Sequence, residues 1–311
     1  MSMSASARTF FKPTPFASWE LVVMRMLFAL VIWDAIPEAM NVAGVPQPTG
    51  LALFFPDLVV GFGALFGATW FKFVIAALLV IYALGSAAVI TTPLLLMVTV
   101  FAGTLTNSQG AITHHSQIVS LVLLAQSGCL VYDLIRHRKW RTGLLGQPVD
   151  REIQVAYVTQ QAVVAAYMVS AYTKLKESGL DWFVNAARFP IQLKKNTRMA
   201  YFNELKEHGS DSSFLTDLPA RTEALLIASS NLCRIIIGSG LVLEIAVVLA
   251  LAGRAWAFFF GIAFVLFHST ISKIMGLDFD FNIYILSIFF ILPGISAAVV
   301  HWSRAATKRN K

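Results

Sequence analysis

Long apolar runs separated by short polar connections dominate the chain. Crossing the hydrocarbon core of a bilayer takes about 20 mostly apolar residues in a helix. Because backbone polar groups in lipid must pair internally, runs of this kind predict α-helices. The pattern therefore predicts an all-α, polytopic membrane bundle with about eight spans. These spans fall near residues 19–36, 70–86, 88–105, 112–134, 154–176, 225–251, 254–272 and 281–302.

Two segments depart from this pattern. Residues 47–67 are apolar but interrupted by proline and glycine, so we expect an interfacial or partly re-entrant segment that is easily miscounted as a span. The long hydrophilic stretch 177–222 lies between the fifth and sixth spans, so residues 1–311 are interpreted as a single membrane domain. Within it, 183–206 mixes aromatic and basic residues, which is typical of an amphipathic element resting on a membrane. Such an element either covers a bundle end or roofs a pocket.

The basic residues predict the orientation, since loops on the cytoplasmic side carry the excess of Lys and Arg. They concentrate in the loop 135–153 and in the tail 304–311, whereas 37–69 and 106–111 contain none. We therefore expect both termini in the cytoplasm and 177–222 on the opposite side. Hydrophobic residues make up 57% of the chain, and the net charge of +7 is explained by this topology and by anionic lipid headgroups. No nucleic-acid-binding motif is present.

Common metal and nucleotide signatures are missing. Cys129 and Cys233 are the two cysteines, and both fall inside predicted spans, which is typical of packing residues. The sequence contains no Cys-x-x-Cys motif, no His-x-x-x-His or Glu-x-x-His spacing and no glycine-rich phosphate loop. We therefore predict no metal site.

Ionisable residues inside spans are costly to bury and mark either structure or function. Arg25 and Glu244 both lie about 10 Å from the cytoplasmic ends of their spans, by the helical rise, so we expect them to pair. Arg234 lies deeper in the sixth span. For these three residues a structural role, as ion pairs or snorkelling side chains, is the favoured interpretation.

A second group gathers at the outer ends of three helices. His115 begins the fourth span, Lys174 closes the fifth and His268 closes the seventh. Ser170 and Ala171 lie one turn before Lys174 and leave room for a partner. A lysine in a dry pocket can act as a general base, and a neutral histidine can orient a substrate or move a proton. Snorkelling of the lysine and structural hydrogen bonding of the histidines remain open alternatives.

Three stretches resemble the membrane domain of vitamin K-dependent gamma-glutamyl carboxylase, which is shared with the bacterial horizontally transferred transmembrane (HTTM) family. One is similar to the family's Lys-Leu and Asp-Trp element. Another is similar to its Asn-His-Ser helix start, with His114 standing where the family has asparagine. The third is similar to its late histidine-containing helix and turn. They are Tyr172-Thr173-Lys174-Leu175 with Gly179-Leu180-Asp181-Trp182, His114-His115-Ser116, and Phe267-His268 with Met275-Gly276-Leu277 and Phe279.

The resemblance implies a chemistry for these residues. Lys174 would deprotonate a reduced vitamin K or another quinone, and His115 would assist the oxygenated intermediate. His114, His268 and Trp182 would line the quinone pocket. The oxygenated quinone would then abstract a proton from a peptide glutamate, and carbon dioxide would add.

Three functions remain open on this basis. The first is a quinone-dependent, carboxylase-like lyase acting on a peptide at the non-cytoplasmic face. The second is an accessory protein for maturation or export of a small secreted peptide. The third is a non-catalytic subunit of a membrane complex that binds lipid or quinone. All three place the chain in a membrane, which we expect to be a bacterial inner or plasma membrane.

Overall fold

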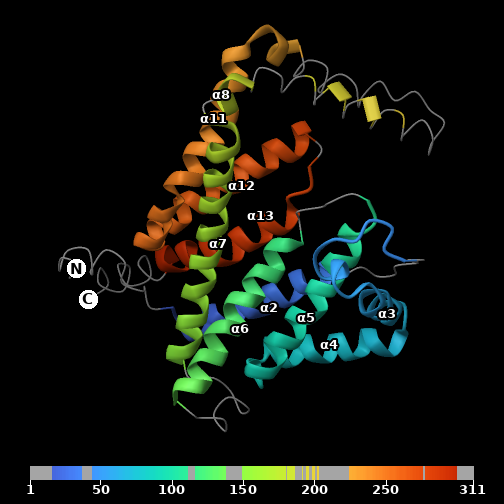
Figure 1. Ribbon diagram of the computed structural model, residues 1–311. Helices are drawn as coiled ribbons and strands as arrows, with labels where there is room; N and C mark the ends of the chain where they lie inside the picture. The colour runs from blue at the N-terminus through green and yellow to red at the C-terminus, as the bar shows by residue number, and fades with distance from the viewer. Residues whose placement is uncertain are drawn as a thin grey trace, which may run out of the picture.

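The computed structural model describes residues 16–36, 44–110, 116–137, 149–179, 181–185, 224–275 and 277–299, with a few positions between 191 and 202. These residues form helices and connecting turns without any β-strand, which confirms the predicted all-helical class (Figure 1). In chain order the elements are α2 (Ser18–Asp34), the 3₁₀ helix η1 (Gly50–Leu53), α3 (Pro56–Phe66), α4 (Thr69–Ala83), α5 (Ala88–Asn107), α6 (Gln117–His137), α7 (Val149–Ser178), α8 (Asp181–Asn185), α11 (Ser230–Ala246), the 3₁₀ helix η4 (Val247–Ala252), α12 (Arg254–Met275), α13 (Asp280–Leu286) and the π-helical turn η5 (Ser287–Ile291).

Each of the eight apolar runs contains a helix, but fewer than eight helices qualify as spans by length and composition. Within the described residues, five stretches are long and apolar enough to cross a membrane, and a sixth qualifies if α3 and α4 count as one bent span. Helix α2 has 17 residues, slightly fewer than the roughly 20 that a perpendicular span needs. Helix α7 has 30 residues, but glutamines and tyrosines reduce its hydropathy. The five stretches are Ala88–Asn107, Gln117–Arg136, Asn231–Ala252, Arg254–Lys273 and Asp280–Val299.

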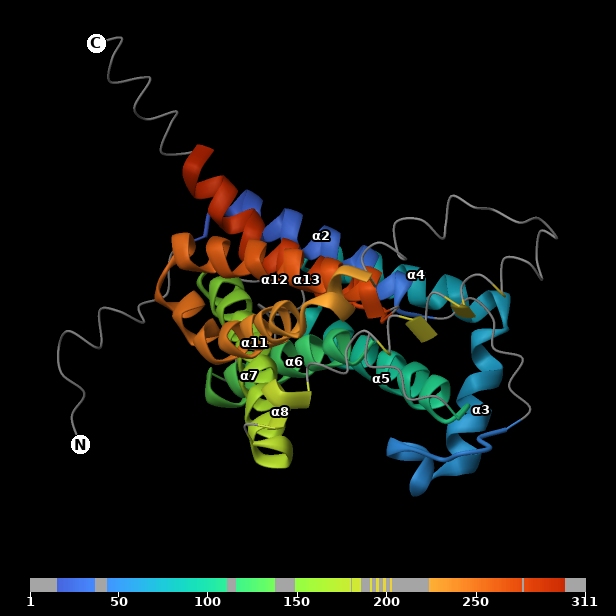
Figure 2. The same cartoon turned by 90° about the horizontal axis from the view of Figure 1, so that it is seen from above.

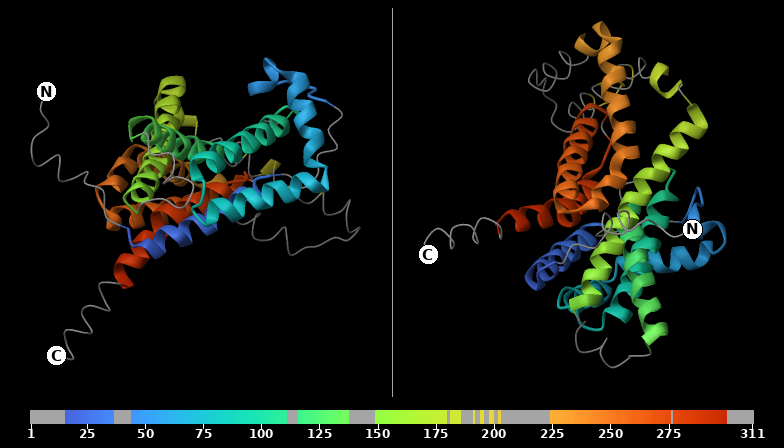
Figure 3. Two further views of the ribbon diagram at one scale, coloured as in Figure 1. Left: turned by 90° about the horizontal axis from the view of Figure 1, so that it is seen from below. Right: turned by 90° about the vertical axis from the view of Figure 1, so that its left-hand side faces the viewer.

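The proline- and glycine-containing segment forms η1 and α3, which then turns sharply into α4. The two helices α3 and α4 meet at 88°, the geometry of a broken span or a re-entrant loop, as Figure 3 shows. Pro56 begins α3, where its missing N–H would be unpaired in any case. Phe62 stacks on Phe101 of α5 with ring centroids 4.3 Å apart and meets Phe71 of α4 edge-on. This aromatic packing holds α3 against the bundle.

Helix α7 is the longest described element and contacts helices from both halves of the chain. By the helical rise its 30 residues extend about 45 Å. It packs on α6 and α2 as well as on α11, η4 and η5. In Figure 1, α6 lies beside the first half of α7, and α11 and α12 lie beside its second half. Seen from above in Figure 2, α2 runs next to α13, so the first and last parts of the described chain are neighbours.

Four ion pairs connect the helices in the described part of the chain, and α7 takes part in three of them. Removing a charge from water is costly unless a partner of opposite charge is close, so each pair specifies which helices are neighbours. The pairs are Arg25 with Glu152, Arg151 with Asp133, Lys174 with Glu244, and Arg254 with Glu20.

The expected pair between Arg25 and Glu244 is wrong. Arg25 pairs with Glu152 near the start of α7, whereas Glu244 pairs with Lys174 near its end. The 22 residues between Glu152 and Lys174 separate the two pairs by about 33 Å along the helix. Two side chains that lie equally far from the ends of their helices need not be neighbours. Helices α2 and α11, which carry Arg25 and Glu244, pack on different parts of α7. Arg234 is exposed on α11, and its guanidinium donates to Asn231 at 3.4 Å.

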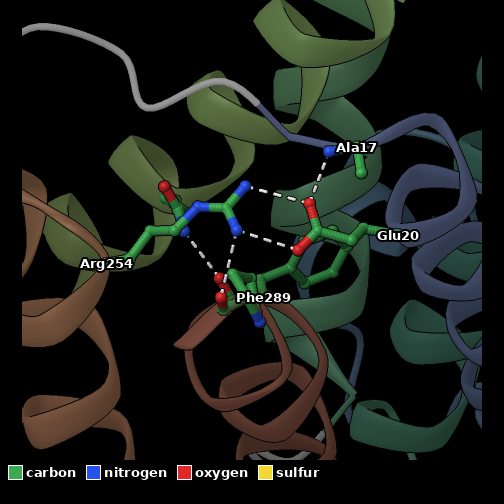
Figure 4. A network of polar contacts seen from close by, with 6 residues as sticks. Ala17, Glu20, Arg254 and Phe289 are labelled. Carbon is green, nitrogen blue, oxygen red and sulfur yellow. Dashed lines mark hydrogen bonds and ion pairs between the residues drawn. The ribbon is translucent and has the colours of Figure 1, made fainter. Parts of the chain in front are cut away.

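The pair between Arg254 and Glu20 belongs to a polar network between α2, α12 and the helical segment that contains η5 and Pro293 (Figure 4). Arg254 donates to both carboxylate oxygens of Glu20 at 2.9 Å and to the Pro293 carbonyl at 3.3 Å. The Ala17 N–H donates to the same carboxylate at 2.5 Å. The Phe289 carbonyl lies in the π-helical turn and accepts from Gln160 of α7 at 2.6 Å. Glu20 is completely buried, so its charge depends on Arg254.

We predict that Arg254→Gln lowers the free energy of unfolding by about 3 kcal/mol, because it leaves the buried Glu20 carboxylate without a counter-ion. The thermal unfolding midpoint of the purified protein in mild detergent measures this loss. Arg234→Gln is the matched control, since Arg234 is exposed and makes only a local contact within α11. Equal midpoints for the two variants would contradict the structural role of the Arg254–Glu20 pair.

Candidate functional site

An ion pair between α7 and α11 forms the centre of the candidate site. Lys174 Nζ lies 2.5 Å from Glu244 Oε1, and the Glu244 side chain is 6% exposed. Ser170, one turn earlier on α7, donates to the same oxygen at 3.4 Å. The partner that Ser170 and Ala171 leave room for is therefore Glu244. The short side chains on α7 let the acidic side chain of α11 approach the lysine.

Helix α8 covers this ion pair. The ring of Trp182 lies with its centroid 5.3 Å from Lys174 Nζ, a cation–π contact. Its neighbour Phe183 packs against Gly238 of α11, where a Cβ atom would come within 2.6 Å of the Phe183 ring. Glycine at this position therefore permits α8 to pack closely on α11. This contact places Trp182 next to Lys174.

A second polar group lies two turns away on α7. Tyr167 Oη and His268 Nε2 of α12 are 2.8 Å apart, and the Asn282 side chain of α13 donates to Tyr167 Oη at 3.3 Å. His268 is 4% exposed, and its ring packs against Phe264 and Phe279. Three helices thus meet at a histidine enclosed by aromatic rings.

The two groups share one face of α7. Tyr167, Ser170 and Lys174 are spaced three and four residues apart, the spacing that places side chains above one another on a helix. The seven residues from Tyr167 to Lys174 correspond to about 10 Å along the axis. The structure therefore brings Lys174, His268 and Trp182 to one side of α7. His114 and His115 lie outside the described residues, so their proposed place in the site stays a prediction.

Three buried polar atoms of this site have no hydrogen-bond partner within the described part of the chain. They are Glu244 Oε2, Trp182 Nε1 and His268 Nδ1. A buried polar group without a partner costs about 1–3 kcal/mol, so such atoms in a native structure call for an explanation. The indole N–H can only donate and the carboxylate oxygen can only accept, while the imidazole nitrogen does either according to its tautomer. Each of these atoms is suited to a hydrogen bond with a small polar group such as a hydroxyl.

Metal binding finds no support in the described residues. They contain no group of three or more His, Cys, Asp or Glu side chains close enough to hold a metal ion. Cys129 and Cys233 are free thiols, and Cys233 is buried, with its sulfur 3.4 Å from the Leu226 carbonyl.

Comparisons with known protein families, curated protein sequences and solved structures found no match for this chain.

Sequence reasoning missed two members of the site and misassigned a third. Tyr167 and Asn282 were not singled out, and Glu244 was paired with the wrong arginine. A signal for Tyr167 exists in the sequence, because it lies seven residues before Lys174 and hence on the same helical face. No comparable signal identifies Asn282, since its contact joins residues 115 positions apart.

We predict that Lys174→Met lowers the free energy of unfolding by roughly 3 kcal/mol, because Glu244 is left as an unpaired buried charge. The double variant Lys174→Met/Glu244→Leu should recover most of this loss, since neither charge remains. Thermal unfolding in detergent for all four members of the cycle measures the coupling.

Lys176→Met is the matched control, because Lys176 is exposed on the same turn of α7. A loss in Lys174→Met no larger than that in Lys176→Met would show that the ion pair contributes nothing to stability.

Proposed function

We propose that the chain is a membrane-embedded enzyme in which Lys174 and Glu244 transfer protons to and from a reduced quinone. The observation that carries the proposal is the partly buried ion pair, in which the Glu244 carboxylate is buried and one of its oxygens, like the nearby Trp182 N–H, has no hydrogen-bond partner in the described residues. A structural ion pair alone does not require a free indole N–H and a free imidazole nitrogen nearby. We further propose that the chain is a relative of the HTTM proteins, on the residues around Lys174 and His268.

The geometry of this site supports the proposed proton transfer. The Lys174 ammonium already donates to Glu244, so passing that proton to the carboxylate leaves a neutral amine. The amine can then accept a proton from a hydroxyl of the substrate, as a general base does. The Trp182 N–H is free to donate to the oxyanion that forms, which would stabilise the developing charge. Tyr167, His268 and Asn282 form a second hydrogen-bonded group that can orient the other end of an aromatic ring.

We propose reduced vitamin K or a similar quinone as the molecule that binds here. Its hydroxyl groups match the unpaired donor and acceptor atoms, and its ring matches the aromatic side chains Trp182, Phe264 and Phe279. When bound and oxygenated, such a cofactor supplies the strong base of carboxylase-like chemistry. The proposed second substrate is a glutamate of a small peptide, which would lose a proton and take up carbon dioxide.

The proposed placement in the membrane follows from the basic loops and the apolar helices. All eight helical runs would contribute to the membrane domain, with both termini in the cytoplasm and the Lys174 site toward the opposite side of a bacterial inner or plasma membrane. Helix α7 supports this assignment because its 30 residues can cross a bilayer with length to spare. A quinone, being apolar, would reach the site from the lipid.

We predict that the purified protein in lipid nanodiscs converts reduced vitamin K and oxygen to the epoxide and water. Glu244→Gln should lower the rate at least about 100-fold, because general acid–base catalysis typically contributes that much or more. Chromatographic quantification of the epoxide measures the rate, and unfolding midpoints show whether each variant is folded.

Tyr167→Phe tests the second group independently and removes only one hydroxyl group. Lys176→Met is the control that leaves the site intact. Formation of epoxide at equal rates by the wild type and a folded Glu244→Gln variant would rule out the proposed proton transfer. Binding of the quinol without any turnover would favour a non-catalytic quinone-binding subunit.

We also predict that short tags at both termini are digested by protease only when the cytoplasmic side of the membrane is exposed. A tag inserted at residue 210 should be digested from the opposite side. Sealed vesicles of known orientation make the comparison. Digestion of the two termini from opposite sides would contradict an even number of spans.

A further inference from the structure

A groove lies between α6 and α7, well separated from the candidate site. Its volume is about 340 Å³, within the range of cavities that hold small ligands. Tyr157, which lines it, is 17 residues before Lys174, or about 25 Å along α7. The groove is open to the surface, since Tyr132 is 61% exposed and Gln154 is also exposed. Its lining residues are Cys129, Tyr132, Ile153, Gln154, Tyr157 and Val158.

An exposed arginine, Arg136, lies at one end of this groove. Arg136 lies one turn after Tyr132 on α6, donates to the Tyr132 hydroxyl at 2.9 Å and places its guanidinium 5.9 Å from the ring centroid. The groove therefore combines an apolar channel with a positive end. This is the arrangement of a lipid acyl chain and its charged headgroup.

The acidic residues nearby do not cancel this positive end. Asp133 is paired with Arg151, and Glu152 is paired with Arg25. Asp150 is exposed in the first turn of α7, where the positive end of the helix dipole offsets its charge. Arg136 has no acidic partner among the ion pairs of the described residues, so its guanidinium remains available to an anion.

We propose that this groove binds an anionic phospholipid, with an acyl chain lying along Cys129 and Tyr157 and the phosphate held by Arg136. A guanidinium suits a phosphate because its planar fork of N–H groups matches two phosphate oxygens. The site lies near the end of α6 that carries Arg136, and an anionic membrane leaflet attracts basic residues of this kind. This lipid would brace α6 against α7, independently of any chemistry at Lys174.

The reactivity of Cys129 reports whether a lipid occupies the groove, because this cysteine is half-buried in the groove lining. The other cysteine, Cys233, is fully buried. The experiment compares the full chain in nanodiscs of phosphatidylcholine alone with nanodiscs that also contain phosphatidylglycerol. Alkylation of Cys129 by a bilayer-soluble maleimide is followed by mass spectrometry, and Cys129→Ser supplies the background from Cys233. We expect phosphatidylglycerol to slow alkylation, since a bound chain covers the thiol.

Arg136→Gln should remove this protection. We expect the phosphatidylglycerol concentration that half-protects Cys129 to rise about fivefold, the effect of one basic residue at a membrane surface. Arg234→Gln is the matched control, because it removes an exposed arginine that lies away from the groove. Unfolding midpoints establish that both variants are folded.

Two results would overturn the proposal. One is an alkylation rate that is the same in both lipids for the wild type. The other is equal protection by phosphatidylglycerol in a folded Arg136→Gln variant and in the wild type, which would assign the effect to the membrane surface as a whole.

Discussion

Charged groups buried among apolar helices must be paired, and this constraint organises the structure around α7. The cost of taking an ion out of water is several kcal/mol, so an unpaired charge in such a bundle is strongly unfavourable. Each ion pair joins two different helices, and the pair between Glu20 and Arg254 joins residues 234 positions apart. Apolar packing alone is tolerant of sliding and rotation, whereas a carboxylate and a guanidinium must meet at one place. The ion pairs therefore define the register of the helices.

The ion pairs near the two ends of α7 lie in different surroundings. Near its start, Arg25 and Glu152 border a cavity of about 40 Å³, which has room for a few waters. There Tyr82 donates to Gln126 at 2.9 Å, and Gln126 donates to Thr159 at 3.2 Å. Thr92, which borders the same cavity, has a buried hydroxyl without a hydrogen-bond partner in the described residues, so unpaired polar atoms occur near both ends of α7. The two ends differ in the cation, because an arginine keeps its proton whereas a lysine can give one up and act as a general base. That difference makes the end with Lys174 and Glu244 the candidate for chemistry.

Close packing at two glycines helps to position side chains of the candidate site. Gly238 allows Phe183 to approach α11, and Gly240 allows Phe267 to do the same, since a Cβ at Gly240 would lie 2.2 Å from that ring. Phe183 is next to Trp182, and Phe267 is next to His268. The two glycines thus permit the close contacts that place Trp182 and His268 around the ion pair. The side chains that touch Lys174 depend on neighbours that have no chemical role themselves.

The sequence by itself determined the helical class and the places where helices form, because backbone groups in an apolar run have no alternative to internal hydrogen bonding. It also predicted, from their positions at helix ends, that Lys174 and His268 belong to one site. Only the tertiary structure decided that Glu244 belongs to Lys174 and that Tyr167 and Asn282 belong to His268. Helical spacing specifies which residues share a face of one helix, but it does not specify which helix packs on that face. That choice depends on the pairing of charges and on the fit of side chains between helices, which act across the whole chain.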